Sequence, residues 1–248
     1  MSLDRTIIGA AALGVLVVSP LEASLIPKHD YEIKGQSIPE QSKRYTAFHL
    51  LNQGTMHLKN ERFHDAYHSL NQGLNLLEMA RDIGGDFDYA EANYRLGRWY
   101  FEVAQSKQNL SHGARSRLFN SAVSYFDVSE REFEHVRRDP SQQSNANLLQ
   151  RLFDLNRYMT DAYYALGNFK NASNHIIKVI QQDPRDYYVG ILVNLSSRLR
   201  GKDNLELIQK IYSSFDKSLA DRIIRIIIGL TDTQTDFAVG TSGTSEDK

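Results

Sequence analysis

Cysteine is absent from the 248 residues of this chain, and proline is scarce, with 5 residues. Without a thiol, the chain has no disulfide framework, no thiolate metal site and no cysteine nucleophile. The sequence also lacks a glycine-rich phosphate loop, a G-x-S-x-G motif and a paired acidic motif beyond the ordinary charges of helix faces. We therefore expect no catalytic residue, no metal and no cofactor, and the chain is not predicted to be an enzyme.

A surplus of basic residues is also missing, since 29 Lys and Arg stand against 30 Asp and Glu. If residues 1–24 are removed, 28 residues of each sign remain. Proteins that bind nucleic acid usually show a basic excess or stripe, because contacts with phosphates supply most of their affinity. We therefore expect no nucleic-acid partner. The composition, with 41% apolar and 24% charged residues, is typical of one soluble globular domain or a short solenoid.

The first 24 residues resemble a secretory signal peptide. A short polar start ending at Arg5 precedes an apolar run at residues 7–18, and Ala23 or Ser24 fits the small position before a cleavage site. The run is shorter than the roughly 20 apolar residues that cross a bilayer. An uncleaved anchor in the inner membrane, formed by the same run, remains the alternative. No cysteine follows the run, which excludes a bacterial lipoprotein anchor.

Residues 25–41 are mixed and polar and are broken by two prolines and a glycine, which predicts a linker. Three glycosylation sequons occur farther on, but two of them fall in expected helices, so we interpret all three as chance. The chain is therefore predicted to be exported to a bacterial periplasm. The sequons begin at Asn109, Asn171 and Asn194.

The most informative segment runs from Phe153 to Pro184. It contains a small and an aromatic residue that end a first helix, a glycine at a turn, a small residue where two helices approach closely, and two apolar residues before the proline. This pattern resembles one tetratricopeptide repeat. A single helical hairpin cannot bury its apolar face, so neighbouring repeats are expected. The residues that carry the resemblance are Ala162, Tyr163, Gly167, Ala172, Ile176 and Val179.

A second match to the repeat lies at residues 47–80. Gly54 takes the small position of the first helix, and Ala66 follows it at the spacing of the family. Leu70 and Gly73 take the remaining close-packing positions of the second helix. The pattern predicts helices over residues 42–58 and 63–81.

A third match begins at Ala90 and departs from the family. Gly97 takes the small position of a first helix, but Asn109 stands where the next small residue is expected, and Ala122 comes thirteen residues later. We expect a first helix prolonged to about Lys107, a loop over 108–113 and a long second helix to about Arg138.

After the repeat at residues 153–184, residues 187–200 and 204–214 show helical spacing of apolar residues and predict a fourth pair. Residues 218–230 are more apolar than the solvent-facing end of a solenoid usually is. Two interpretations stay open, a final helix that seals the last repeat, or a surface for docking or self-association. Residues 231–248 offer little to bury and are predicted to be a disordered tail.

One constellation resembles a metal site, because His64 and His68 are four residues apart on one helical face. Asp65 stands where zinc proteases have Glu, and no third ligand follows at a family spacing. Ala66 between the two histidines is already explained as a close-packing residue. We therefore predict no metal site, and a helical enzyme with a site around these histidines is the weaker alternative.

The resemblance implies an all-α, right-handed superhelical solenoid of about four antiparallel helix pairs plus a C-terminal helix, over residues 42–230. In the family, the first helices line a groove whose exposed positions select the ligand. Carried over to this sequence, the groove positions are Phe48, Leu51, Thr55 and Leu58, then Glu91, Tyr94, Arg98 and Phe101, and then Asp154, Arg157, Asp161 and Tyr164.

These positions run from apolar to mixed charge. The family's clamp for chaperone carboxyl termini needs Lys and Asn at several of them, and only Asn52 comes near, so a chaperone ligand is not expected. The alternative for any one of them is that it packs against a neighbouring repeat. We expect four apolar anchors and two arginines that fix the register of a helix or extended peptide, namely Phe48, Leu51, Tyr94, Phe101, Arg98 and Arg157.

The function predicted from the sequence is that of a protein-binding scaffold or adaptor of the cell envelope. Its partners would be envelope or membrane proteins. An integral subunit of a larger membrane-associated complex, with the long helices between Ala90 and Arg138 as contact surfaces, remains the alternative.

Overall fold

The computed structural model describes residues 40–80, 86–107 and 109–239, and the regular structure in these ranges is entirely α-helical. This confirms the expected all-α class. The expected signal peptide, residues 25–39 of the expected linker and residues 240–248 lie outside the described residues. The helices are α2 (Glu40–Lys59), α3 (Phe63–Met79), α4 (Phe87–Ser106), α5 (His112–Arg137), α6 (Ala146–Ala165), α7 (Phe169–Gln182), α8 (Asp186–Ser196), α9 (Lys202–Ser214) and α10 (Lys217–Val239).

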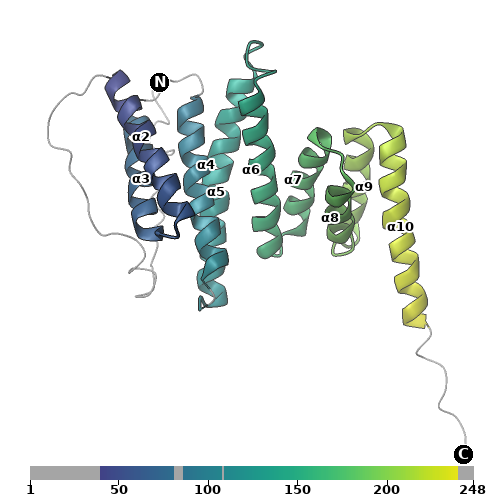
Figure 1. The fold of residues 1–248 in the computed structure, drawn as a ribbon. Coiled ribbons are helices and arrows are strands. Elements are labelled where there is room, and N and C mark those ends of the chain that lie inside the picture. Colours follow the sequence, from purple (N-terminus) through teal and green to yellow (C-terminus); the bar gives the residue numbers. More distant parts are fainter. Residues whose placement is uncertain (1–39, 81–85, 108, 240–248) are drawn as a thin grey trace, which may run out of the picture.

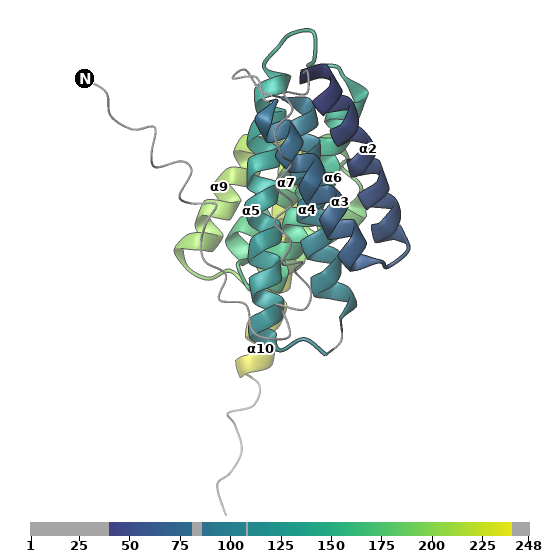
Figure 2. The same cartoon turned by 90° about the vertical axis from the view of Figure 1, so that its left-hand side faces the viewer.

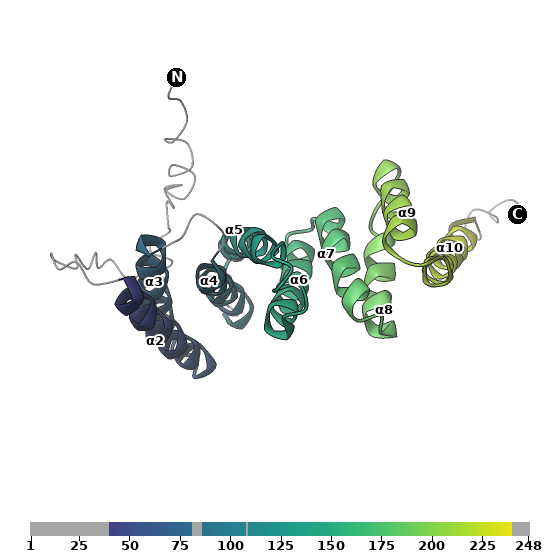
Figure 3. The same cartoon turned by 90° about the horizontal axis from the view of Figure 1, so that it is seen from above.

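The helices follow one another in a row from α2 at one end to α10 at the other (Figure 1). Seen along this row from the α2 end, they run up and down near a common direction (Figure 2). Seen from above, α2, α4 and α6 lie on one side of the row and α3, α5 and α7 on the other (Figure 3). Each of these helices packs mainly on its neighbours in sequence, and α4 also contacts α2 and α6.

Within the first two pairs, a glycine allows the helices to approach closely. A Cβ atom on Gly54 would lie 2.6 Å from Cγ of Leu70, and one on Gly97 would lie 2.6 Å from two ring carbons of Phe126. Ala66 and Ala122, which the sequence placed at close-packing positions, are fully buried. The small residues therefore do what the pattern predicted, because any larger side chain would push the paired helices apart.

The turn between α6 and α7 is closed by Gly167, whose φ of +72° is in the left-handed region. Its N–H donates to the carbonyl of Tyr164 at 3.0 Å, and the N–H of Asn168 donates to the carbonyl of Tyr163 at 2.9 Å. This pair of bonds is the Schellman arrangement that ends a helix. The turn between α2 and α3 has the same arrangement with Glu61, at φ +57°, in the place of glycine.

The expected boundaries of the third pair are confirmed to within a few residues, since α4 ends at Ser106 and α5 runs from His112 to Arg137. The fourth pair differs from the expectation. Its helices occur at the predicted places, but α9 packs on α7 and α10 more than on α8. The last described helix reaches Val239, whereas the sequence placed the end of the helical domain at residue 230. Disorder of the tail stays a prediction.

The apolar segment 218–230 lies in α10. Ile223, Ile224 and Ile227 are buried in the core formed by α7, α8 and α9, whereas Ile226 and Ile228 are exposed. Burial of one face is the contact expected of a helix that seals the row. Self-association through this segment stays a prediction.

Candidate functional site

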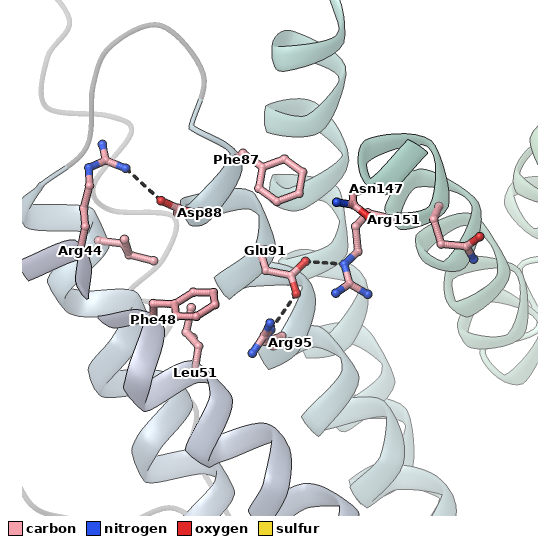
Figure 4. Close-up of a pocket in the computed structure, with 11 residues that line it drawn as sticks. Arg44, Phe48, Leu51, Phe87, Asp88, Glu91, Arg95, Asn147 and Arg151 are labelled. Atoms are coloured by element: carbon pink, nitrogen blue, oxygen red, sulfur yellow. Dashed lines mark hydrogen bonds and ion pairs between the residues drawn. The ribbon is translucent and has the colours of Figure 1, made fainter. Parts of the chain in front are cut away.

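A cavity of about 380 Å³ lies between α2, α4 and α6, the first helices of three successive pairs. Its apolar lining consists of Phe48, Leu51, Leu77 and Phe87. Phe48 is 56% exposed and points from α2 toward α4 (Figure 4). Cavities of this size, apolar with a few polar groups, are common binding places in proteins. The polar lining comes from Arg44, Asp88, Glu91, Arg95, Asn147, Gln150 and Arg151.

The centre of the polar lining is the carboxylate of Glu91, which is only 6% exposed. The Nε atom of Arg95, one turn farther along α4, lies 2.7 Å from Oε1. The Nε atom of Arg151, on α6, lies 2.7 Å from Oε2 (Figure 4). The contact with Arg95 is a hydrogen bond and the contact with Arg151 is an ion pair, and a buried carboxylate is stable only with such partners. Glu91 therefore binds α4 to α6 at the edge of the cavity.

The position of Arg95 is fixed further by α2. Its Nη1 atom donates to Oδ1 of Asn52 at 2.9 Å and to the hydroxyl of Thr55 at 3.1 Å. The guanidinium of Arg151 lies over the ring of Tyr94, with 5.4 Å from Cζ to the ring centroid. Such contacts hold a planar guanidinium in place. Both arginines are therefore held in fixed orientations before any ligand arrives.

The other end of the cavity is fixed by Asp86, the N-cap of α4. Its Oδ1 accepts from the backbone N–H groups of Asp88 and Tyr89, and its Oδ2 lies 2.7 Å from Nη2 of Arg44. The Nη1 atom of Arg44 lies 3.4 Å from Asp88. An Asp at this position satisfies free N–H groups of the first turn. The cap therefore also ties the start of α4 to α2.

A second cavity, of about 250 Å³, lies farther along the seam between α2 and α4. Thr55, Leu58 and Arg98 line it, as the sequence predicted for groove positions. Arg98 pairs with Glu102 at 3.6 Å and lies over the ring of Tyr158, at 5.3 Å from its centroid. Six of the eight predicted positions on α2 and α4 therefore line one of these two cavities.

Three predicted anchors are buried, since Leu51 and Tyr94 are 2% exposed and Phe101 is 3% exposed. Leu51 still lines the first cavity, whereas Tyr94 and Phe101 line neither cavity. Tyr94 and Phe101 pack on Tyr158 of α6, with ring centroids 6.1 Å and 5.1 Å away. Burial also raises the pKa of Tyr94, which keeps its hydroxyl protonated. Tyr94 and Phe101 therefore pack between helix pairs, because both α2 and α6 contact α4.

The predicted residues of α6 lie outside both cavities. Arg157 lies over the ring of Phe153, Asp161 is exposed, and Tyr164 contacts Phe169 and Arg198 near the α6–α7 turn. Asp154 accepts a hydrogen bond from Gln150 at 3.2 Å. These side chains are not brought together with Phe48.

The sequence argument missed Arg44, Arg95 and Arg151. A signal for two of them was present, because Arg95 is one turn after the groove position Glu91 and Arg151 is three residues before the groove position Asp154. Residues so spaced share a helical face. Nothing in the sequence pairs Arg151 with Glu91, which is sixty residues away.

The histidines of α3 lie outside both cavities. The side chain of His64 is exposed, with Nδ1 at 3.6 Å from Asp65, and Nε2 of His68 lies 3.1 Å from the amide nitrogen of Gln72. Within the described residues, no group of three or more His, Asp or Glu could hold a metal ion. None of the helices described is both long enough and apolar enough to cross a membrane.

Comparison with known proteins gives no relative for this chain, since neither a protein-family model nor a curated protein sequence matches it.

Proposed function

We propose that this chain is a protein-binding scaffold or adaptor of a cell envelope, built as a right-handed solenoid similar to tetratricopeptide repeats. Its seam between α2, α4 and α6 takes up a helix or an extended peptide of a protein partner. The observation that carries the proposal is the 380 Å³ cavity, which is lined by residues of α2, α3, α4 and α6 and edged by the half-exposed Phe48. An exposed aromatic beside a preformed cavity is the kind of anchor that dominates interface energies.

The export and envelope location rest on residues 1–24, with residues 7–18 as either signal or anchor. The partner class follows from that location. Because the polar lining of the cavity is already held by ion pairs, the surface needs little ordering when a partner binds.

The test is capture of partners from a membrane extract by the purified chain and by two variants. Phe48→Asp places a charge at the cavity edge and should abolish capture, because an apolar anchor is lost and a carboxylate must be desolvated. Tyr187→Asp is the matched control, since Tyr187 is 71% exposed on α8, away from both cavities. Thermal melting confirms that both variants fold.

Equal recovery of the same proteins by all three chains would contradict the proposal. Loss of capture with Tyr187→Asp alone would show that the partner binds near α8 and not at the cavity. A chain that elutes only as part of a stable complex from its native membrane would instead be an integral subunit.

A further inference from the structure

The charges around the cavity are separated between its two ends. At one end, Glu91 carries one negative charge between Arg95 and Arg151. At the other end, Arg44 carries one positive charge between Asp86 and Asp88. Two guanidinium groups therefore share one carboxylate at the first end, and at the second end two carboxylates lie beside one guanidinium group. This separation gives a bound chain a preferred direction.

Arg151 presents its positively charged guanidinium group to the cavity. Its Nε is used by Glu91 and its plane lies on Tyr94, but no hydrogen bond or ion pair joins its Nη atoms to the described residues. Its side chain is 34% exposed, compared with 13% for Arg95. A guanidinium can donate hydrogen bonds from its two Nη atoms to a second carboxylate when Nε already contacts a first one.

We propose that Arg151, positioned by Glu91, receives a carboxylate of the bound peptide, and that a neighbouring apolar side chain of the peptide packs on Phe48. This inference rests on the proposed function and names the chemistry of its ligand. One carboxylate matches the second of the two guanidinium groups that share Glu91, whereas a phosphate would carry nearly two negative charges. The apolar lining beside Arg151 takes the second side chain, so the motif is an acidic residue close to an apolar one.

The experiment begins with selection of a displayed library of random dodecapeptides on the full chain. The expected result is enrichment of Asp or Glu within a few residues of an apolar side chain. The strongest sequence is then synthesised with a fluorophore, and its affinity is measured by fluorescence anisotropy at low salt. Three forms of the peptide are compared: the original, one with the acidic residue changed to its amide, and one with an amidated carboxyl end.

Four protein variants complete the test. Arg151→Gln should weaken binding about tenfold or more, because a charge-assisted hydrogen bond is lost. The affinity of Arg151→Lys should lie between that of Arg151→Gln and that of the natural chain, since lysine keeps the charge but lacks the planar guanidinium with its paired donors. Arg131→Gln, whose side chain is 70% exposed on α5, is the matched control and should change affinity less than twofold. Phe48→Asp should abolish binding.

The decisive comparison is a double-mutant cycle. Amidation of the acidic side chain should cost the natural chain about tenfold and cost Arg151→Gln nearly nothing, because the two changes remove the same contact. If the amidated carboxyl end shows this coupling instead, the carboxylate is that of the chain end.

Two other outcomes separate the inference from the proposed function. If peptides bind, Phe48→Asp abolishes binding and neither carboxylate couples to Arg151, the inference fails and the proposed function stands. If no selected peptide is sensitive to Phe48→Asp, both are overturned. Thermal melting of Arg151→Gln and Arg151→Lys separates loss of the ligand contact from unfolding.

Discussion

The side chains of Asn156 and His175 meet between two separate apolar cores, with 2.8 Å between Oδ1 of the amide and Nδ1 of the imidazole. The first core is formed by α2 to α6 and the second mainly by α7 to α10. The amide nitrogen of Asn156 donates to the carbonyl of Leu152 at 2.7 Å. The imidazole is 8% exposed and stacks on Tyr163. A nearly dry polar contact therefore lies where the two cores meet, beside Tyr163, which packs against both.

The first prediction concerns acid stability. Burial lowers the pKa of His175 from 6.5 to about 4, with the nearby Lys178 and Lys210 acting in the same direction and Glu130 opposing them. The neutral imidazole is therefore favoured in the folded chain. Its contribution to the free energy of unfolding is complete above pH 6.5 and is lost as the pH falls from 6.5 to about 4, by up to about 3 kcal/mol.

A comparison with His175→Gln isolates this contribution, because glutamine does not titrate and its amide can still donate to Asn156. The comparison is needed because the pKa of Asp127 is raised to about 6 by desolvation and by Glu130, which opposes the loss on acidification. Urea unfolding at several pH values should show the natural chain losing stability relative to the variant below pH 6.5. The prediction would be contradicted if the free energy of unfolding changed with pH in the same way for both chains.

The second prediction concerns the contact between α4 and α5. Gly97→Ala should lower the free energy of unfolding by about 1–3 kcal/mol, because the new methyl group would meet the ring of Phe126 and, at 3.2 Å, the carbonyl of Ala122. Gly190→Ala in α8 is the control, since nothing lies within 4 Å of its Cβ position. The control should stabilise the chain by up to about 1 kcal/mol through helix propensity. Urea unfolding measures both, and equal effects would refute the close-approach argument.

The third prediction concerns the turn that ends α2. Glu61→Gly should raise the free energy of unfolding by about 1 kcal/mol, because a residue with a Cβ atom is strained at φ +57°. Gly167→Ala, at the equivalent place after α6, should lower it by a similar amount. Thermal melting should therefore move in opposite directions for the two variants. A loss of stability in Glu61→Gly would show that the Glu61 side chain contributes more than the strain costs.

The fourth prediction concerns the last helix. Ile223→Ala should cost about 2–5 kcal/mol, because Ile223 is fully buried. Ile226→Ala should cost less than about 0.5 kcal/mol, because Ile226 is 42% exposed. Light scattering on the Ile226→Ser chain measures self-association separately. If the natural chain is a dimer and Ile226→Ser is a monomer of equal stability, the exposed face of α10 is an interface as well as a cap.

A fifth prediction concerns the buried charge of the candidate site. Glu91→Ala should destabilise the chain by about 2–3 kcal/mol, because two arginines then lose their shared carboxylate and Arg95 is nearly buried. Glu102→Ala, which breaks a more exposed pair with Arg98, should cost less than about 1 kcal/mol. If the two variants unfold at the same urea concentration, Glu91 does not hold α4 to α6.

The sequence by itself determined where the helices lie and that α2 packs on α3, α4 on α5 and α6 on α7. The signals were local: Gly54 and Ala66 marked where two adjacent helices touch, Gly167 marked a turn, and the spacing of apolar residues marked each helix. Such signals depend on the conformation of a few consecutive residues and on the helical period, both of which the chain carries within each segment.

Only the tertiary structure decided which faces of those helices remain open. Phe48, Tyr94 and Phe101 were all predicted at groove positions, but Tyr94 and Phe101 pack on Tyr158 of α6, whereas Phe48 on α2 remains 56% exposed. The contact between Glu91 and Arg151 likewise depends on how the second pair stacks on the third. Stacking between pairs is set by long-range packing, and no periodicity within a single helix encodes it.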